Sequence, residues 1–264
     1  MARRRLSRSS AAARGAVVLG LGSLLALAGC ASIPARRPVA PDAQAAMARI
    51  EERARAFSDL RTLAEIKIRR DKQVQRLTGA LLLRSPASMR FEALTVFGIP
   101  VMLVAGDGQS MTLWEVLDNR AFILPASPDA TRRWLGLALG SDDLVAVLSG
   151  RVLAIKDPAS VELLPADGLG PSLRLTSSAG EQRIWLDPGT GQVRQVEWTG
   201  GKSPARVLFD EAAPDGPPTG LKLTTLDGKL EVVARYREPR MNTGFDPALV
   251  SLTVPEHVRI QDFR

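Results

Sequence analysis

The residues that could carry catalytic chemistry in this chain are few. His257 is the only histidine and Cys30 the only cysteine. A catalytic triad would therefore need His257, close to the C-terminus, as its base. Metal sites built from paired cysteine and histidine ligands are excluded. The sequence also lacks a P-loop, a G-x-S-x-G elbow and a G-x-G-x-x-G turn, so the common nucleotide-binding and hydrolase signatures are missing.

Carboxylates remain to be considered, because acid–base catalysis by aspartate or glutamate needs no sequence motif. The most noticeable pair is Asp142-Asp143, but adjacent side chains on a helix do not face each other. With Ser141 they suit a helix N-cap better. Asp107 stands in Gly-Asp-Gly, which is a turn sequence. We therefore predict that the chain is not an enzyme and uses no cofactor.

Cys30 indicates a different chemistry. Five arginines within the first 14 residues precede an apolar run, 15–28, which ends in Leu27-Ala28-Gly29-Cys30. This is the pattern of a secretory signal, and the run is shorter than the roughly 20 residues that a membrane-spanning helix needs. The last four residues resemble a bacterial lipobox, in which the cysteine is acylated and becomes the N-terminus. We predict a signal peptide over 1–29 and a lipid anchor at Cys30; an ordinary signal peptide followed by a chance cysteine is the alternative.

The predicted signal peptide changes the meaning of the net charge. The whole chain has 35 basic and 28 acidic residues, a formal charge of +7. Removing 1–29 takes away five arginines and no acid, which leaves 30 basic against 28 acidic residues. A nucleic-acid footprint requires clustered positive charge on the folded domain, so we predict no nucleic-acid partner. With Cys30 acylated, no disulfide is available within the monomer, and stability must come from a hydrophobic core.

The acylated N-terminus and a proline-containing tether are predicted over 30–41, and a single domain over 42–264. The domain is predicted to begin with a helix over 42–60. Met47, Ile50, Ala54 and Phe57 share one face of this helix, and charged residues lie largely opposite. We expect the apolar stripe to pack on a sheet; a helix lying on a membrane surface is the alternative.

Most of the remaining chain shows the two-residue alternation of β-strands. A first strand is predicted over 62–69, an antiparallel meander over 74–117, and another strand over 119–124. Helical spacing replaces the alternation over 128–149 and predicts two helices, the first stopping at Gly140 and the second capped by Ser141. Short strands then resume, and they are predicted over 160–164, 172–176, 182–186, 192–198, 205–209, 221–226 and 230–236.

One connection in the meander has unusual chemistry. Turns normally carry polar side chains because they face water, yet Phe97-Gly98-Ile99-Pro100 places large apolar side chains on both sides of its glycine. Either the rest of the protein covers this turn or the turn contacts an apolar partner. We predict that Phe97 and Ile99 are exposed; packing of Phe97 on the 42–60 helix is the alternative.

These elements predict a mainly β fold with a few helices: an antiparallel sheet of about ten or more strands, with the helices of 42–60 and 128–149 across it, which can enclose an apolar space. A compact sandwich with a filled interior is the rival. The enclosed space is predicted to be apolar and suited to acyl chains. Its lining is predicted from strand alternation and helix periodicity to be Ile66, Ile68, Leu81, Leu83, Phe91, Met102, Val104, Leu113, Phe122, Trp134 and Leu148.

The order of these parts resembles a known family. It runs from lipobox, tether and amphipathic helix through LTGALLLRSPASMRFEALTVFGIPVMLVAGDGQSMTLW to a helical pair ending in LVAVLSG, a run of hairpins and a closing LVSLTVPEHVRI. This order is similar to that of the LolA/LolB-like superfamily of lipoprotein carriers, and most similar to LolB-type outer-membrane lipoproteins. The resemblance covers essentially all of 30–264. Segments 165–171 and 214–220 depart from it as additional loops.

The resemblance implies a fold and a function. By this resemblance the fold is a half-open antiparallel β-barrel, whose mouth the helices of 42–60 and 128–149 close and whose interior would hold lipoprotein acyl chains. The chain would be anchored at the periplasmic face of the outer membrane, receive cargo from a soluble periplasmic LolA-like carrier, and insert it through a protruding loop, which is by position Phe97-Gly98-Ile99-Pro100. Ala31, in place of aspartate after the acylated cysteine, resembles an outer-membrane sorting signal. A carrier of another amphiphile, or a non-catalytic structural or assembly lipoprotein that binds a protein partner, are the alternatives.

Overall fold

The computed structural model describes residues 41–201, 203–213 and 216–264. By its contacts the chain divides into two units, Met1–Arg36 and Arg37–Arg264, and the described residues all lie in the second. The predicted signal peptide, Cys30, Ala31 and the tether up to residue 40 lie outside the described residues, as does part of the predicted 214–220 loop.

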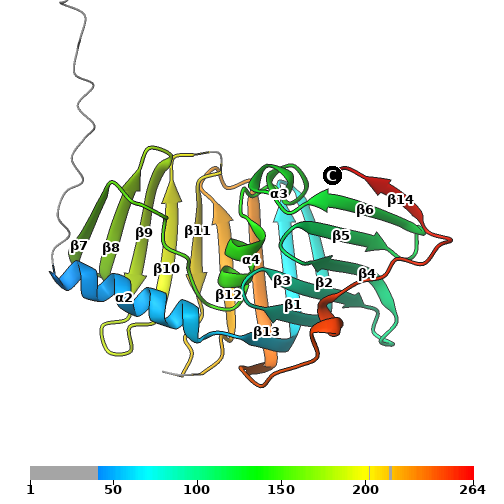
Figure 1. Cartoon of the computed structure of the whole chain (residues 1–264), viewed down its shortest axis with the longest axis horizontal. Helices are drawn as coiled ribbons and strands as arrows, with labels where there is room; N and C mark the ends of the chain where they lie inside the picture. Colours follow the sequence, from blue (N-terminus) through cyan, green and yellow to red (C-terminus); the bar gives the residue numbers. More distant parts are fainter. Residues whose placement is uncertain (1–40, 202, 214–215) are drawn as a thin grey trace, which may run out of the picture. The chain divides into compact units, whose positions relative to one another are not determined.

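One sheet of 14 strands dominates the described unit (Figure 1). Its spatial order is β14-β6-β5-β4-β3-β2-β1-β13-β12-β11-β10-β9-β8-β7. Neighbouring strands are antiparallel, except that β14 runs parallel to β6. The strands are β1 Asp59–Arg70, β2 Gln73–Arg84, β3 Ser88–Leu94, β4 Pro100–Gly106, β5 Ser110–Glu115, β6 Arg120–Pro125, β7 Ser160–Asp167, β8 Gly170–Ser177, β9 Gly180–Leu186, β10 Val193–Thr199, β11 Ala205–Phe209, β12 Gly220–Thr225, β13 Leu230–Met241 and β14 Arg259–Asp262.

The sheet consists of two meanders joined along their first and last strands. Strands β1–β6 form one meander and β7–β13 the other, and long β1 pairs with long β13 from Leu60↔Met241 to Arg70↔Leu230. This joint places β6 near one edge of the sheet and β7 at the other. The chain between them must therefore cross the face of the sheet. Because β7 and β14 do not pair with each other, the sheet stays open, as predicted.

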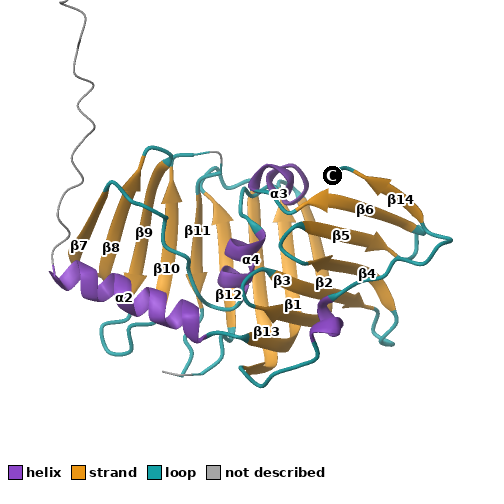
Figure 2. Ribbon diagram, viewed as in Figure 1, coloured by secondary structure: helices purple, strands orange, loops and turns teal. Residues whose placement is uncertain are grey.

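The helices are α2 Pro41–Ala56, α3 Pro128–Leu135, α4 Ser141–Leu148 and the short 3-10 turn η1 Pro247–Val250 (Figure 2). Helix α2 lies over β7 and β8, and α4 over β2 and β3. Ala43, Ala46 and Ile50 are buried at the three- and four-residue spacing of one helix face. None of the helices in the described part of the chain has the length and apolar character that crossing a membrane requires.

The helix-covered face of the sheet forms one continuous hydrophobic core. Alternate residues of the strands, such as Leu60, Leu81, Ile184 and Val207, are almost completely buried there. Burial of a side chain of this size contributes about 1.5–3 kcal/mol to folding. The expected alternation is clearest in the second half of β2, in β3 and in β11, where it decides which side chains face the core.

Three predicted helix boundaries are wrong. Helix α2 ends at Ala56 and not at residue 60, because the buried residues Phe57 and Asp59 already lead into β1. Helix α3 ends at Leu135, where Gly136 takes the left-handed conformation at φ 81°, so the stop is not at Gly140. Gly140 is the N-cap of α4, and Ser141 lies inside that helix.

The C-terminal segment forms a part of the structure that the sequence did not predict. Leu103, Ala105 and Ala121 are buried on the face of the sheet opposite to the main core. The segment after β13 contributes to that face: Arg90 Nη1 donates to the Ser251 carbonyl, and η1 contacts β2 and β3. Strand β14 then covers the outer edge of β6. Segment 165–171, predicted as an added loop, is instead mostly strand, since β7 reaches Asp167 and β8 begins at Gly170.

Candidate functional site

A pocket of about 470 Å³ lies between the C-terminal end of α2, the segment that follows α4, and the ends of β10, β11 and β13. It is partly open. Its apolar walls include Ile50 and Phe57 from the α2 region, Val152 from the segment after α4, and Phe209 and Met241 from the strands. A volume of this size lies within the range of about 300–1,000 Å³ that is usual for small-molecule sites.

The polar part of the pocket is organised around Arg151. Its Nη1 donates to the Ala54 carbonyl at 2.7 Å and its Nε to Ser149 Oγ at 2.9 Å. The guanidinium carbon lies 3.8 Å from the centre of the Phe57 ring, which gives a cation–π contact. Burial lowers the pKa of Arg151 to about 10. The side chain therefore stays protonated at neutral pH, in surroundings that solvate it poorly.

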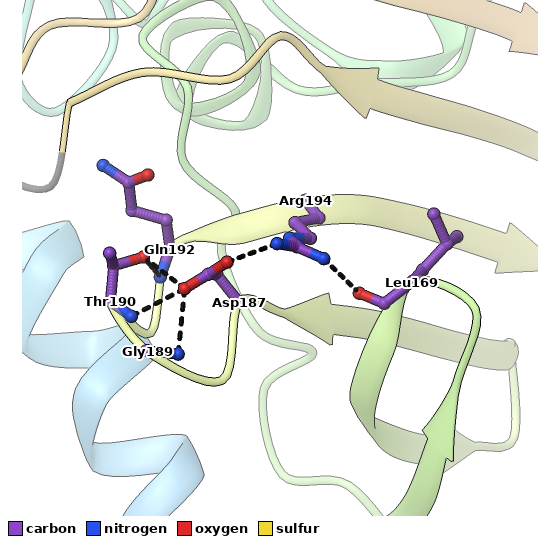
Figure 3. A network of polar contacts seen from close by, with 6 residues as sticks. All are labelled: Leu169, Asp187, Gly189, Thr190, Gln192 and Arg194. Atoms are coloured by element: carbon purple, nitrogen blue, oxygen red, sulfur yellow. Dashed lines mark hydrogen bonds and ion pairs between the residues drawn. The ribbon is translucent and has the colours of Figure 1, made fainter.

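The turn between β9 and β10 borders the pocket and is held by a polar network (Figure 3). Asp187 Oδ1 accepts hydrogen bonds from Gly189 N and Thr190 N, and Oδ2 pairs with Arg194. The bonds from Thr190 lower the pKa of Asp187, so the carboxylate form is stabilised. Arg53 of α2 donates to the Thr190 carbonyl at 2.8 Å. This network fixes the turn and ties it to the helix.

The acyl-chain lining predicted from the sequence occupies other positions, and none of its eleven residues borders this pocket. Leu81, Leu83 and Phe91 face the helices but are packed in the core. A charge at Phe91 would therefore disrupt folding before it could report on acyl-chain uptake. Five residues are only partly buried and pack against that core: Ile66, Ile68, Met102, Val104 and Leu148.

The remaining three predicted lining residues lie towards the β6 side of the sheet. Phe122 of β6 and Trp134 of α3 have ring centres 5.3 Å apart, and the rings of Trp134 and Phe263, also tilted to each other, have centres 5.7 Å apart. Leu113 lies opposite Phe122 in the β5–β6 ladder. All three are half-buried and outside the main core.

The β3–β4 turn displays its apolar side chains in water. Val96, Phe97 and Ile99 are 95%, 87% and 60% exposed, so Phe97 does not pack on α2. Thr95 holds the turn: its Oγ1 accepts from Phe97 N and Ile99 N, and its carbonyl accepts from Gly98 N. Gly98 has φ 78°, a conformation that glycine takes without strain, and Pro100 starts β4.

The other residues with chemical potential are not brought together. His257 is exposed, and its carbonyl accepts from Asn119 Nδ2. Burial raises the pKa of Asp143, and the charge of Asp142 raises it further. Asp107 caps its own turn by accepting from Gln109 N and Ser110 N. Within 41–201, 203–213 and 216–264, no three His, Cys, Asp or Glu side chains gather where they could hold a metal ion.

The sequence did not indicate the pocket or Arg151. Phe57, Arg151, Phe209 and Met241 lie far apart along the chain, and only the crossing of the sheet by the segment after α4 brings them together. The available signal was indirect. Arg151 directly follows the LVAVLSG segment at the end of the helical pair, and it is the first charged residue after Asp143.

This large open, mainly antiparallel sheet with helices packed on one face matches solved structures of the LolA-like fold, so the predicted resemblance is confirmed at the level of the fold. A LolA superfamily protein from Nitrosomonas europaea matches with a TM-score of 0.51 and 11% identity, over 80% of this chain and 97% of that one. A domain named for outer membrane lipoprotein sorting, from Vibrio parahaemolyticus, matches with a TM-score of 0.54 and 12% identity, over 78% and 95%.

A DUF1329 family protein from Desulfovibrio piger matches with a TM-score of 0.55 and 12% identity, over 80% of this chain and 96% of that one. No protein-family model and no curated protein sequence matches the chain. At identities of 11–12%, TM-scores of 0.51–0.55 establish the shared fold alone, and the function must be argued from the site.

Proposed function

We propose that this chain is a LolB-like lipoprotein, which is anchored through Cys30 at the periplasmic face of the outer membrane and receives acylated cargo and inserts it into the bilayer. The cargo would be lipoproteins or another amphiphile, delivered by a soluble LolA-like carrier. The observation that supports this function best is the β3–β4 turn. It presents three large apolar side chains in water on a turn that its own hydrogen bonds fix.

The energetics suit a transient insertion device. Each of these side chains would gain about 1.5–3 kcal/mol on burial in hydrocarbon. Even the three together, about 4.5–9 kcal/mol, would give only reversible membrane binding, and stable attachment would come from the acyl chains at Cys30. The gain is enough to orient the domain while cargo passes to the bilayer. The structural neighbours, named for the LolA superfamily and for outer membrane lipoprotein sorting, support the same class of function.

The double substitution Phe97→Ser, Ile99→Ser tests the role of the turn. Both side chains are exposed, so we expect stability to change by less than about 0.5 kcal/mol. Cargo should still be received from the carrier, while its transfer into liposomes fails. Leu117→Ser is the matched control, because Leu117 is 79% exposed on the β5–β6 turn. Transfer at the normal rate by a stable double variant would refute insertion by this turn.

The anchor is tested by Cys30→Ala. Because the acyl chains would supply nearly all the membrane affinity, we expect this variant in the soluble fraction after cell fractionation. If it still sediments with membranes after a high-salt wash, the membrane affinity does not come from Cys30.

A further inference from the structure

Arg151 is a partly buried cation for which the described residues provide no counter-ion. The segment after α4 carries it beneath the end of α2. Its pKa shift arises from burial alone, with no contribution from a nearby carboxylate. A buried charge without a partner is normally costly. An unpaired positive charge at the wall of a pocket therefore indicates that a ligand neutralises it.

The protein satisfies only part of the guanidinium. An arginine offers five N–H donors, and the hydrogen bonds of Arg151 within the described chain go to the Ala54 carbonyl and to Ser149 Oγ. Both acceptors lie at helix C-termini, where the helix dipole contributes about half a negative charge. Nη2 has no acceptor among the described residues. The group is thus held in position with donors left for a ligand.

The other charged residues that border the pocket do not act as a counter-ion for Arg151. Glu52 and Asp210 border the pocket but are exposed, so water screens their charges. Arg53 also borders the pocket, and its Nη2 donates to the Thr190 carbonyl. Of the charges around the pocket, the guanidinium of Arg151 is the one whose pKa burial lowers, and electrostatic interactions are stronger where solvent screens them less.

We infer that this pocket binds an amphiphile with one anionic head group, a carboxylate or a phosphate ester, which pairs with Arg151 while the apolar part lies against Ile50, Phe209 and Met241. A planar guanidinium can bind either oxyanion through two parallel hydrogen bonds. The inference rests on the proposed function in that the ligand is an amphiphile, and it adds the charge of the head group.

Binding of three single-chain probes to the purified unit Arg37–Arg264 tests this assignment. They are dodecanoate, dodecyl phosphate and the uncharged glycerol monododecanoate, measured by isothermal titration below their aggregation concentrations. We expect the two anions to bind about tenfold or more tightly than the neutral ester, since a charge-assisted hydrogen bond contributes about 1.5–3 kcal/mol. Arg151→Gln should abolish this preference while neutral binding persists, and Arg151→Lys should keep most of it.

Two controls keep the test decisive. Arg76→Gln makes the same charge change on an exposed residue of β2 outside the pocket and should retain the preference. If Arg151→Gln does not fold, a photoreactive diazirine analogue of dodecyl phosphate on the wild-type unit should label peptides that contain Phe57 or Phe209. Equal affinity for all three probes, an unchanged preference in Arg151→Gln, or labelling elsewhere would overturn the inference. Failure of all three probes to bind would instead contradict the proposed amphiphile binding itself.

Discussion

Gln182 should stabilise this fold through hydrogen bonds, although it lies in an apolar core. Its side chain is 1% exposed on β9. The amide nitrogen donates to the Leu153 carbonyl, and the amide oxygen accepts from Ile155 N, both at 2.9 Å. These two bonds clamp the segment that crosses the sheet from α4 to β7. That segment also carries Arg151 and Val152 into the pocket.

Gln182→Leu separates the contribution of the hydrogen bonds of Gln182 from that of apolar burial at this position. The variant adds an apolar side chain to the core, which is worth at most about 1.5–3 kcal/mol. It also leaves two backbone groups without partners at about 1–3 kcal/mol each, in addition to the two lost bonds of about 1 kcal/mol each. We therefore expect a net loss of about 1–6 kcal/mol. For a domain of this size that lowers the melting temperature by about 2–4 °C per kcal/mol.

Chemical denaturation followed by circular dichroism measures this loss, and hydrogen exchange at the Ile155 amide locates it. Gln195→Leu is the matched control: Gln195 is also buried, but its side chain makes no hydrogen bond within the described chain. Its substitution loses no hydrogen bond, so stability should stay unchanged or rise. A Gln182→Leu variant as stable as the wild type, with unchanged protection at Ile155, would refute the clamp.

Two further predictions concern local geometry and charge. A Cβ at Gly79 would lie 1.8 Å from the Glu92 carbonyl oxygen. Gly79→Ala should therefore push β2 away from β3 and lower the free energy of unfolding, measured with denaturant, by about 3 kcal/mol or more. Gly168→Ala is the control and should be nearly neutral, because a Cβ at Gly168 meets nothing within 4 Å. Because the pKa of Asp143 is raised by burial and by Asp142, its ionised form lowers stability at neutral pH, and this cost disappears as the pH falls through the raised pKa towards the unfolded value. Asp143→Asn should therefore be more stable than the wild type at pH 7, with a difference that shrinks on acidification; a constant difference across this pH range would contradict the assignment.

The strands were predictable because one face of this sheet is buried. A strand such as β11 must place Ala205, Val207 and Phe209 towards the core, and the resulting alternation is visible in the sequence itself. The exposed turn was predictable for the opposite reason. Phe97 and Ile99 conflict with the polar composition that solvent contact favours in turns. Strand β14 was not predictable, because all four of its residues are exposed and no alternation marks them.

The pocket was not predictable from local patterns, and the predicted lining shows why. Alternation reports which side of a strand a residue faces, and Leu81, Leu83 and Phe91 do face the helices. It does not report whether the space opposite is filled. In β2 and β3 helix α4 packs over that face, whereas the pocket opens beyond the end of α2, at the ends of β10, β11 and β13.

The topology of the sheet explains why a charged residue occurs at position 151. Because β1 pairs with β13, β6 and β7 lie at opposite sides of the sheet, and the connection between them must cross its covered face. Such a crossing cannot join the sheet ladder, so its backbone groups need other partners. Gln182 supplies two of them at Leu153 and Ile155.

Arg151, at the start of the crossing, in turn supplies a donor to the carbonyl of Ala54 near the end of α2. An apolar side chain at 151 would leave that carbonyl without its donor, whereas arginine satisfies it and retains free donors that face the pocket. The same side chain can thus fasten the crossing segment to α2 and present a positive charge to a ligand.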